Sequence, residues 1–395
     1  MSDAQHSPYR FVIVVVVALA SFLGNFTIFQ MAGLAPKIIG LASLTGSQFG
    51  LVVGISILTA AVLGLPLGAL GDRVGVKPVV TAAMAVTIAG CVGRYLATPS
   101  FGAYLFWMFL VGATNAALNA NFIKVLGVWL PPSGIGVGVG CYLTGIGLGQ
   151  ATSIGMGPSF ELIGPAFMVS IVLAVVVAVV WLALIRNPPS LNRAQVQPMI
   201  ASLSYVAKRK NVWIGGLGIL FMLGTYVCLT SFAANFLGAE KGAAPKSASA
   251  CASAVAAFML VGALIADRLA RLMRSSRMFL LACGLISGMG VFLAAKVSFG
   301  ALTLVLLSLS GLASGAFCSF ILSLPMLLRD IGPNYAGSAG GLISTLQSFG
   351  GFLLPTLIPW LAGNSLPTVM LLTAGGFVLM GLVTLPLPEL VRKRG

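Results

Sequence analysis

The sequence predicts an all-α membrane protein with twelve transmembrane helices arranged in two six-helix bundles. Three observations predict this fold. Hydrophobic residues make up 58% of the 395 residues and charged residues only 7%, whereas soluble domains carry about 25% charged residues. The apolar residues are grouped in runs of about 20, which is the length that crosses a bilayer as a helix. The basic residues lie mainly at alternate ends of these runs.

The first six runs fill the N-terminal half of the chain. The opening run is too long and too continuous for a cleavable signal peptide, and no small-residue cleavage site ends it. The third run ends close to Arg94, the fourth contains Asn119 and Lys124, and the fifth is rich in glycine. The helices predicted here are 11–33, 47–69, 78–97, 103–127, 135–157 and 163–185.

The longest polar stretch separates these runs from six more. Residues 186–211 contain two adjacent prolines and five basic residues, so we expect a cytoplasmic linker there. An N-terminal bundle over 1–185 and a C-terminal bundle over 212–395 follow from this division. Such a two-fold plan is typical of secondary transporters. The helices predicted after the linker are 212–236, 246–266, 278–297, 299–328, 336–360 and 367–387.

The distribution of charge predicts the orientation in the membrane. With the N-terminus inside, 16 of the 22 Lys and Arg residues fall in cytoplasmic segments, where basic residues are enriched. We therefore expect a multi-pass protein of the cell membrane, the inner membrane of a bacterium, with both termini cytoplasmic. The expected partners are the lipid bilayer and a small-molecule solute, and the chain is expected to be a monomer. The positive charges are scattered between apolar runs, so no nucleic acid is expected.

Composition also excludes several chemistries. The six cysteines lie in apolar runs without a CxxC pair, so we interpret them as small hydrophobic residues. The single histidine, His6, lies in the N-terminal tail, and no nucleophile, base or metal cluster occurs at membrane depth. The absence of a GxxxxGK[ST] motif excludes ATP-driven transport by this chain alone. We expect no enzymatic activity, no cofactor and no metal.

A glycine-rich turn follows the second predicted helix. The sequence GALGDRVGVK over 68–77 resembles the G-x-x-x-D-R-x-G-[RK]-[RK] loop of the major facilitator superfamily, with Val76 in place of a basic residue. A degenerate copy, ALIADRLAR over 263–271, follows the eighth helix. The resemblance implies the fold of that superfamily and a gating latch between the two halves. The residues that match the latch are Gly68, Asp72, Arg73, Gly75, Lys77, Asp267 and Arg268.

Helices three to five show a narrower resemblance. The positions of Arg94, Asn119, Lys124 and Tyr142 are similar to those of the cyanate-permease-like branch of the superfamily. The glycine-rich fifth and eleventh helices are similar to those of the nitrate/nitrite porters. This resemblance implies a small anion as solute. The cyanate-permease-like branch has an arginine in the first helix where this chain has Thr27, which weakens the case for cyanate itself.

Polar groups at membrane depth are costly, so we take them as candidate solute ligands. The interior cations Arg94 and Lys124 favour an anion if they face a cavity, and the alternative is that they extend to lipid headgroups. Interhelical hydrogen bonding is the alternative for the amides. The candidate set is Asn25, Arg94, Asn119, Lys124, Tyr142 and Tyr226.

The leading functional hypothesis is transport of a small anion by alternating access, with nitrate, nitrite, cyanate or a small carboxylate as the solute. No acidic residue lies near mid-depth, which argues against a carboxylate-dependent exporter of organic cations. Two alternatives stay open. One is an exporter of a neutral or weakly polar organic compound, and the other is a membrane sensor that does not transport.

Overall fold

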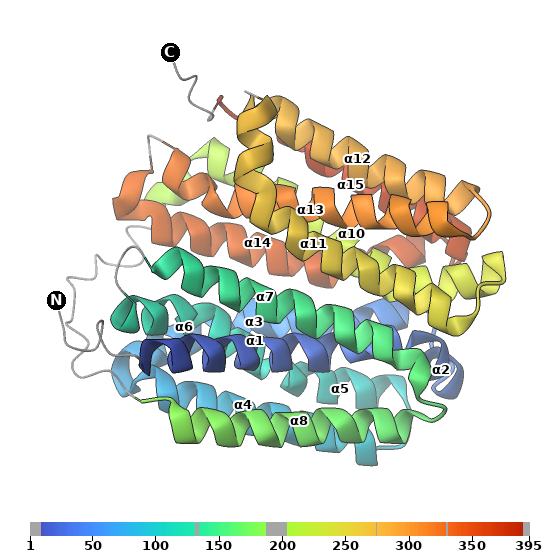
Figure 1. Cartoon of the computed structure of the whole chain (residues 1–395), viewed down its shortest axis with the longest axis horizontal. Coiled ribbons are helices and arrows are strands. Elements are labelled where there is room, and N and C mark those ends of the chain that lie inside the picture. Colours follow the sequence, from blue (N-terminus) through green and yellow to red (C-terminus); the bar gives the residue numbers. More distant parts are fainter. Residues whose placement is uncertain (1–8, 131–133, 187–203, 274, 329–330, 390–395) are drawn as a thin grey trace. The chain divides into compact units, whose positions relative to one another are not determined.

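The computed structural model describes residues 9–130, 134–186, 204–273, 275–328 and 331–389, and these residues form helices without strands (Figure 1). In the first half the α-helices are α1 (Tyr9–Gly33), α2 (Ala35–Leu41), α3 (Gly46–Val74), α4 (Val76–Leu96), α5 (Phe101–Val111), α6 (Ala113–Trp129), α7 (Ile135–Met156) and α8 (Ile163–Leu184). In the second half they are α10 (Lys210–Lys241), α11 (Pro245–Met273), α12 (Ser276–Lys296), α13 (Ala301–Leu327), α14 (Gly332–Leu361) and α15 (Leu366–Val383).

This architecture confirms the predicted fold class. In the described part of the chain, 11 helical spans are long and apolar enough to cross a membrane, and α5 and α6 together count as one of them. The twelfth predicted span is α7, which has 22 residues but is not among the 11. Its glycines and polar residues such as Gln150 lower its mean hydropathy, because a glycine adds length without apolar surface.

The chain divides into two compact units, Met1–Asn192 and Arg193–Gly395. The same helix pairs are in contact within each unit. In the first unit α1 contacts α7 and α4 contacts α8, and in the second α10 contacts α14 and α12 contacts α15. Of the predicted linker 186–211, residues 187–203 lie outside the described residues.

Local signals explain where several helices begin. Thr45 caps α3 by accepting a hydrogen bond from the amide of Gln48, and the Gln48 side chain accepts one from the amide of Thr45 in return. Such a capping box satisfies two backbone N–H groups that have no partner within the helix. Ser100 and Ser275 cap α5 and α12 with one hydrogen bond each, because their hydroxyl oxygens accept from the amides of Ala103 and Met278.

Two of the differences from the predicted boundaries bear on the candidate site. The second helix continues through the Asp-Arg motif to Val74, so this motif forms the last turn of α3 and not a loop, and Gly75 then reverses the chain with φ 95°. The fourth helix is broken at Gly112 into α5 and α6. The carbonyl oxygens near the break accept hydrogen bonds from hydroxyls of neighbouring helices: Ser56 donates to Met108 (2.7 Å) and Thr59 to Phe109 (2.9 Å). These bonds stabilise backbone groups that lipid cannot hydrogen-bond.

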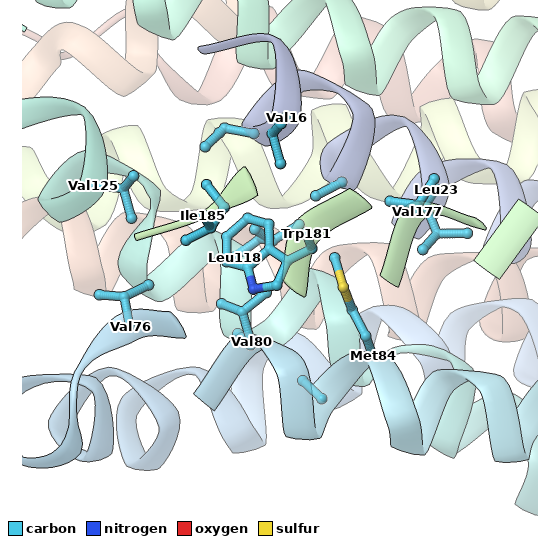
Figure 2. Packing of buried hydrophobic residues seen from close by; sticks show 14 of the residues in the cluster. Val16, Leu23, Val76, Val80, Met84, Leu118, Val125, Val177, Trp181 and Ile185 are labelled. Atoms are coloured by element: carbon cyan, nitrogen blue, oxygen red, sulfur yellow. The ribbon is translucent and has the colours of Figure 1, made fainter. Parts of the chain in front are cut away.

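The core of the first unit brings α1, α4, α6 and α8 together. Figure 2 shows Trp181 of α8 among Val16, Val80 and Leu118, and all four side chains belong to one buried cluster. The Trp181 indole N–H donates to the carbonyl of Lys77 at 3.5 Å. This packing holds the first turn of α4 against the last turn of α8. The charge distribution predicts that these two ends are cytoplasmic.

Candidate solute site and gate

Three carboxamides from three helices meet in the interior of the first unit. Asn25 of α1 donates through Nδ2 to the Oδ1 of Asn115 on α6 at 3.3 Å, and also to the carbonyl of Ser21 at 3.0 Å. Gln150 of α7 donates to the Oδ1 of Asn25, again at 3.3 Å. The three side chains are buried, with 6 to 9% of their surface exposed. We call Asn25, Asn115 and Gln150 the amide cluster.

Close helix approach makes this cluster possible. A Cβ placed on Gly24 would lie 2.4 Å from the Oδ1 of Asn115, so the amide occupies the space that a side chain at Gly24 would fill. On the α7 side, a Cβ on Gly149 would lie 2.4 Å from the carbonyl oxygen of Phe22. Glycine therefore lets α1 contact the Asn115 side chain of α6 and the backbone of α7 closely, as small residues do at helix interfaces in membranes.

A second polar pair lies on the same two helices, α6 and α7. The hydroxyl of Tyr142 donates to the Oδ1 of Asn119, and the Tyr142 ring stacks on Phe122 with centroids 3.9 Å apart and an angle of 8°. Tyr142 is buried, whereas Asn119 is exposed. Asn119 follows Asn115 by four residues, which places both on one face of α6. The exposed amide of Asn119 thus continues the amide cluster to an accessible surface.

Lys124 contacts the predicted gating motif. Its Nζ donates to the carbonyl of Gly68 at 2.9 Å, and the neighbouring Asn121 donates to the carbonyl of Leu67 at 3.2 Å. A Cβ on Gly71 would lie 2.2 Å from the Oδ1 of Asn121. The glycines predicted to serve a turn therefore allow α6 to contact α3. Lys124 therefore contacts the predicted gate residue Gly68.

The other predicted gate residues lie at different places. Lys77 donates to the carbonyl of Leu182 at 2.7 Å and joins α4 to α8, while Arg73 is exposed at the end of α3. Asp267 and Arg268 are both exposed within α11. The side chain of Asp72 lies outside the described residues.

Arg94 is enclosed in the first unit, with 1% of its surface exposed. Its guanidinium donates to the Thr27 carbonyl (2.8 Å), the Gln30 Oε1 (2.8 Å) and the Ser170 hydroxyl oxygen (2.7 Å). Its Cζ lies 4.7 Å from the ring centroid of Phe167. This placement corrects the expectation of a cation that faces a solute or extends to headgroups, because neutral groups of the protein surround the guanidinium.

Tyr226 is the one member of the candidate set that belongs to the second unit. It lies in α10 and is completely buried. A solute therefore has no access to it in this conformation. The candidate residues that come together are Asn25, Asn119 and Tyr142, with Asn115 and Gln150 added by the structure. The four-residue spacing of Asn115 and Asn119 was the sequence signal for the first addition, whereas the partnership of Gln150 with α1 had none.

Other chemistry finds little support in the described residues. They contain no group of three His, Cys, Asp or Glu side chains placed to hold a metal ion. All six cysteines are free, and Cys141 is the one that is not fully buried. The polar groups that converge are amides and a phenol, which exchange hydrogen bonds with a bound molecule without supplying a net charge.

Comparisons with known proteins place this geometry in a family. The family model described as Major Facilitator Superfamily matches residues 11–355. A comparison with curated proteins finds no match. Two similar solved structures are of a bacterial homolog of the human lysosomal transporter Spinster. The inward-facing, unoccupied form has a TM-score of 0.77 and 16% identity, and the inward-facing, occupied form has 0.75 and 15%.

Each of these alignments covers 96% of this chain and 95% of the other. At such low identity the likeness shows the shared fold alone, whereas the family model spans 345 residues from 11 to 355. The 11 membrane-length spans in the described part of the chain, the same helix pairing within each unit and the family match agree. The chain belongs to the Major Facilitator Superfamily.

Proposed function

We propose that this protein transports a small uncharged polar organic solute across the cell membrane by alternating access. The observation that carries the proposal is the grouping of neutral hydrogen-bonding side chains on α1, α6 and α7, which reaches an accessible surface at Asn119. Amides and a phenol offer both donors and acceptors, so they suit a solute that has both, such as an imide or a polyol.

The competing proposal is transport of a small anion such as nitrate, nitrite, cyanate or a small carboxylate. It is supported by the similarity of Arg94, Asn119, Lys124 and Tyr142 to the cyanate-permease-like branch. Arg94 and Lys124 are the two cations that favoured an anion, but both bind neutral groups of the protein. Arg94 donates to groups of α1 and α8, and Lys124 donates to the carbonyl of Gly68. For this reason we rank the neutral solute first.

Uptake into proteoliposomes separates the two proposals. Radiolabelled uracil and mannitol represent an uncharged imide and polyol, and nitrate and acetate represent small anions. We expect saturable uptake of at least one neutral probe. Tyr142→Phe removes the hydroxyl that orients the Asn119 amide. If a misaligned Asn119 loses one hydrogen bond to the solute, worth about 1 kcal/mol, the KM for that probe should rise about fivefold. Tyr95→Phe on α4, where Tyr95 is 38% exposed, is the matched control and should leave the KM unchanged.

The same assay tests the role of Lys124. Lys124→Met should lower the maximal rate for whichever probe is carried while leaving its KM within about twofold, because the lysine contacts the gating motif. Saturable uptake of nitrate or acetate alone, with a raised KM in Lys124→Met, would transfer the proposal to the anion. Absence of any flux, together with binding of a probe, would favour a sensor.

A further inference from the structure

We propose that Arg94 is a positioning residue that holds α1 so that Asn25 is presented to Asn115 and Gln150. This inference rests on the proposed function, because the amide cluster is the site that it serves. Arg94 itself is enclosed by protein, so a solute cannot reach it in this geometry.

The first step is the contact with α1. One terminal nitrogen of the guanidinium donates to the carbonyl of Thr27 and the other to the side chain of Gln30, both at 2.8 Å. Successive residues of an α-helix are rotated by about 100°, so Thr27 and Asn25 lie about 200° apart around the axis. Arg94 therefore holds α1 from the side opposite to the one that presents Asn25.

The second step is the anchorage of Arg94 itself. The nitrogen that contacts Gln30 also donates to the hydroxyl of Ser170 on α8 at 2.7 Å. The guanidinium lies over the ring of Phe167, and its other terminal nitrogen contacts the sulfur of Met108 at 3.5 Å. Three helices, α4, α5 and α8, thus supply a fixed frame against which α1 is held. A planar, forked donor can bridge these partners at once, whereas an ammonium group cannot.

The third step is the fit on the opposite side of α1. The amide of Asn25 reaches Asn115 and Gln150 at 3.3 Å, near the upper limit for an N–H···O bond. The contact of Gly24 with Asn115 leaves no room for α1 to approach α6 more closely. Rotation or translation of α1 away from Arg94 would lengthen or break these bonds. The geometry of the amide cluster therefore depends on the hydrogen bonds that Arg94 donates to α1.

The second unit offers an internal comparison. Helix α12 begins and ends 200 residues after α4, since 76 and 96 correspond to 276 and 296. Matched contacts support this register: Thr87 donates to the carbonyl of Val111, and Ser287 donates to that of Ser310.

At the position matched to Arg94, α12 carries Ala294, which lines a small apolar pocket with Val291 and Met370. The buried cation is therefore not part of the packing that the two units share. It occurs in the unit that also carries the amide cluster.

The test compares two ways of rebuilding the contact. Arg94→Lys keeps the charge but loses the fork. Adding Gln30→Glu gives the lysine a carboxylate partner on α1, whereas adding Ser170→Asp gives it one on α8. The full-length protein is studied in lipid nanodiscs by hydrogen–deuterium exchange of peptides that cover 21–31, a measurement that needs no solute.

We expect exchange in 21–31 to increase about tenfold in Arg94→Lys, because bonds from a charged donor are lost. Exchange should return to within about twofold of the wild-type rate with Gln30→Glu but not with Ser170→Asp. If the lysine variants fail to fold, Gln30→Met with Arg94 intact removes the bond from Arg94 together with the contacts of Gln30 to Ala166 and Ser170. Ser170→Ala, which leaves the bond from Arg94 to Gln30 in place, is its control, and exchange should increase more in Gln30→Met. Unchanged exchange, or equal rescue by both second substitutions, would overturn the proposal.

Uptake distinguishes this inference from the proposed function. If α1 responds as expected but no neutral probe is carried, the positioning role stands and the proposed solute is wrong. If a neutral probe is carried, its KM should increase in Arg94→Lys and recover with Gln30→Glu. Recovery of the KM when Ser170→Asp, and not Gln30→Glu, is added to Arg94→Lys would contradict positioning through α1.

Discussion

The two glycines Gly71 and Gly75 of the Asp-Arg motif are each required by the local structure. Gly75 joins α3 to α4 with φ 95° and ψ 156°, a region that is essentially restricted to glycine. Gly71, one turn earlier, is required for a different reason, because Asn121 occupies the space next to it. The glycines of one motif therefore meet separate needs, one conformational and the other steric.

Replacing Gly75 with alanine should destabilise the protein by about 1–3 kcal/mol, the usual cost of holding a side-chain-bearing residue in such a backbone conformation. Thermal unfolding of the purified protein in detergent measures the effect. Gly102→Ala in α5 is the control, because a Cβ there meets nothing within 4 Å. Equal melting temperatures for Gly75→Ala and the wild type would show that the junction adopts another conformation.

At this scale the sequence predicted which residues are unusual but not what they contact. Arg94 stood out because it is a charge within an apolar run. Its partners Gln30 and Ser170 are 64 and 76 residues away, and both are common residue types in membrane helices. Pairings over such distances depend on how α1, α4 and α8 pack, which no local pattern records.

At the scale of helices, the α1–α7 seam illustrates how glycine composition becomes packing. A Cβ on Gly145 would lie 2.2 Å from the carbonyl oxygen of Ala18, and one on Gly157 would lie 2.0 Å from that of Gly33. The glycine-rich character of the fifth helix was evident from the sequence. The helix against which it packs became evident from the structure.

Gly145→Ala should destabilise the first unit by about 1–3 kcal/mol or more, because a methyl group would overlap the backbone of α1. Gly140→Ala on the same helix is the matched control, since a Cβ there has open space. It should be neutral or stabilising by up to about 1 kcal/mol through higher helix propensity. Detergent melting curves compare the two, and a similar loss in both variants would contradict the seam.

Helix existence was predictable, whereas helix continuity was not. The twelve apolar runs correspond to the observed spans because the thickness of the bilayer sets a minimum length. The break at Gly112 could not be read from the fourth run, since other glycines in the chain lie within continuous helices. It is accompanied by tertiary contacts of Ser56 and Thr59 on α3, whose hydroxyls donate to the carbonyl oxygens of Met108 and Phe109 beside the break.

For the whole molecule, the family match and the helix content establish a polytopic membrane protein. The repeated pairing of helices within the two units agrees with a chain built from related halves. The orientation in the membrane is still an expectation from charge, as basic residues favour the cytoplasmic side.

Cysteine labelling tests this orientation in intact cells. We expect Glu161→Cys, which lies between α7 and α8, to react with a membrane-impermeant maleimide from outside. Arg271→Cys near the end of α11 should react only after permeabilisation. Both positions are exposed, and Cys141→Ala removes the one native thiol that is not fully buried. Labelling of Arg271→Cys in intact cells would reverse the topology.

The enclosure of Arg94 has a consequence for how the chain is made. Ribosomal synthesis delivers α1 first, then α4, and α8 much later, so the guanidinium enters the bilayer before Phe167 and Ser170 exist. A lone arginine costs about 2.5–3.5 kcal/mol at the centre of a span and less near its end, where Arg94 lies in the last turn of α4. Thr27 and Gln30 of α1, which accept hydrogen bonds from Arg94 in the folded protein, are synthesised before it. The first helix therefore carries the partners of Arg94 that are synthesised before it.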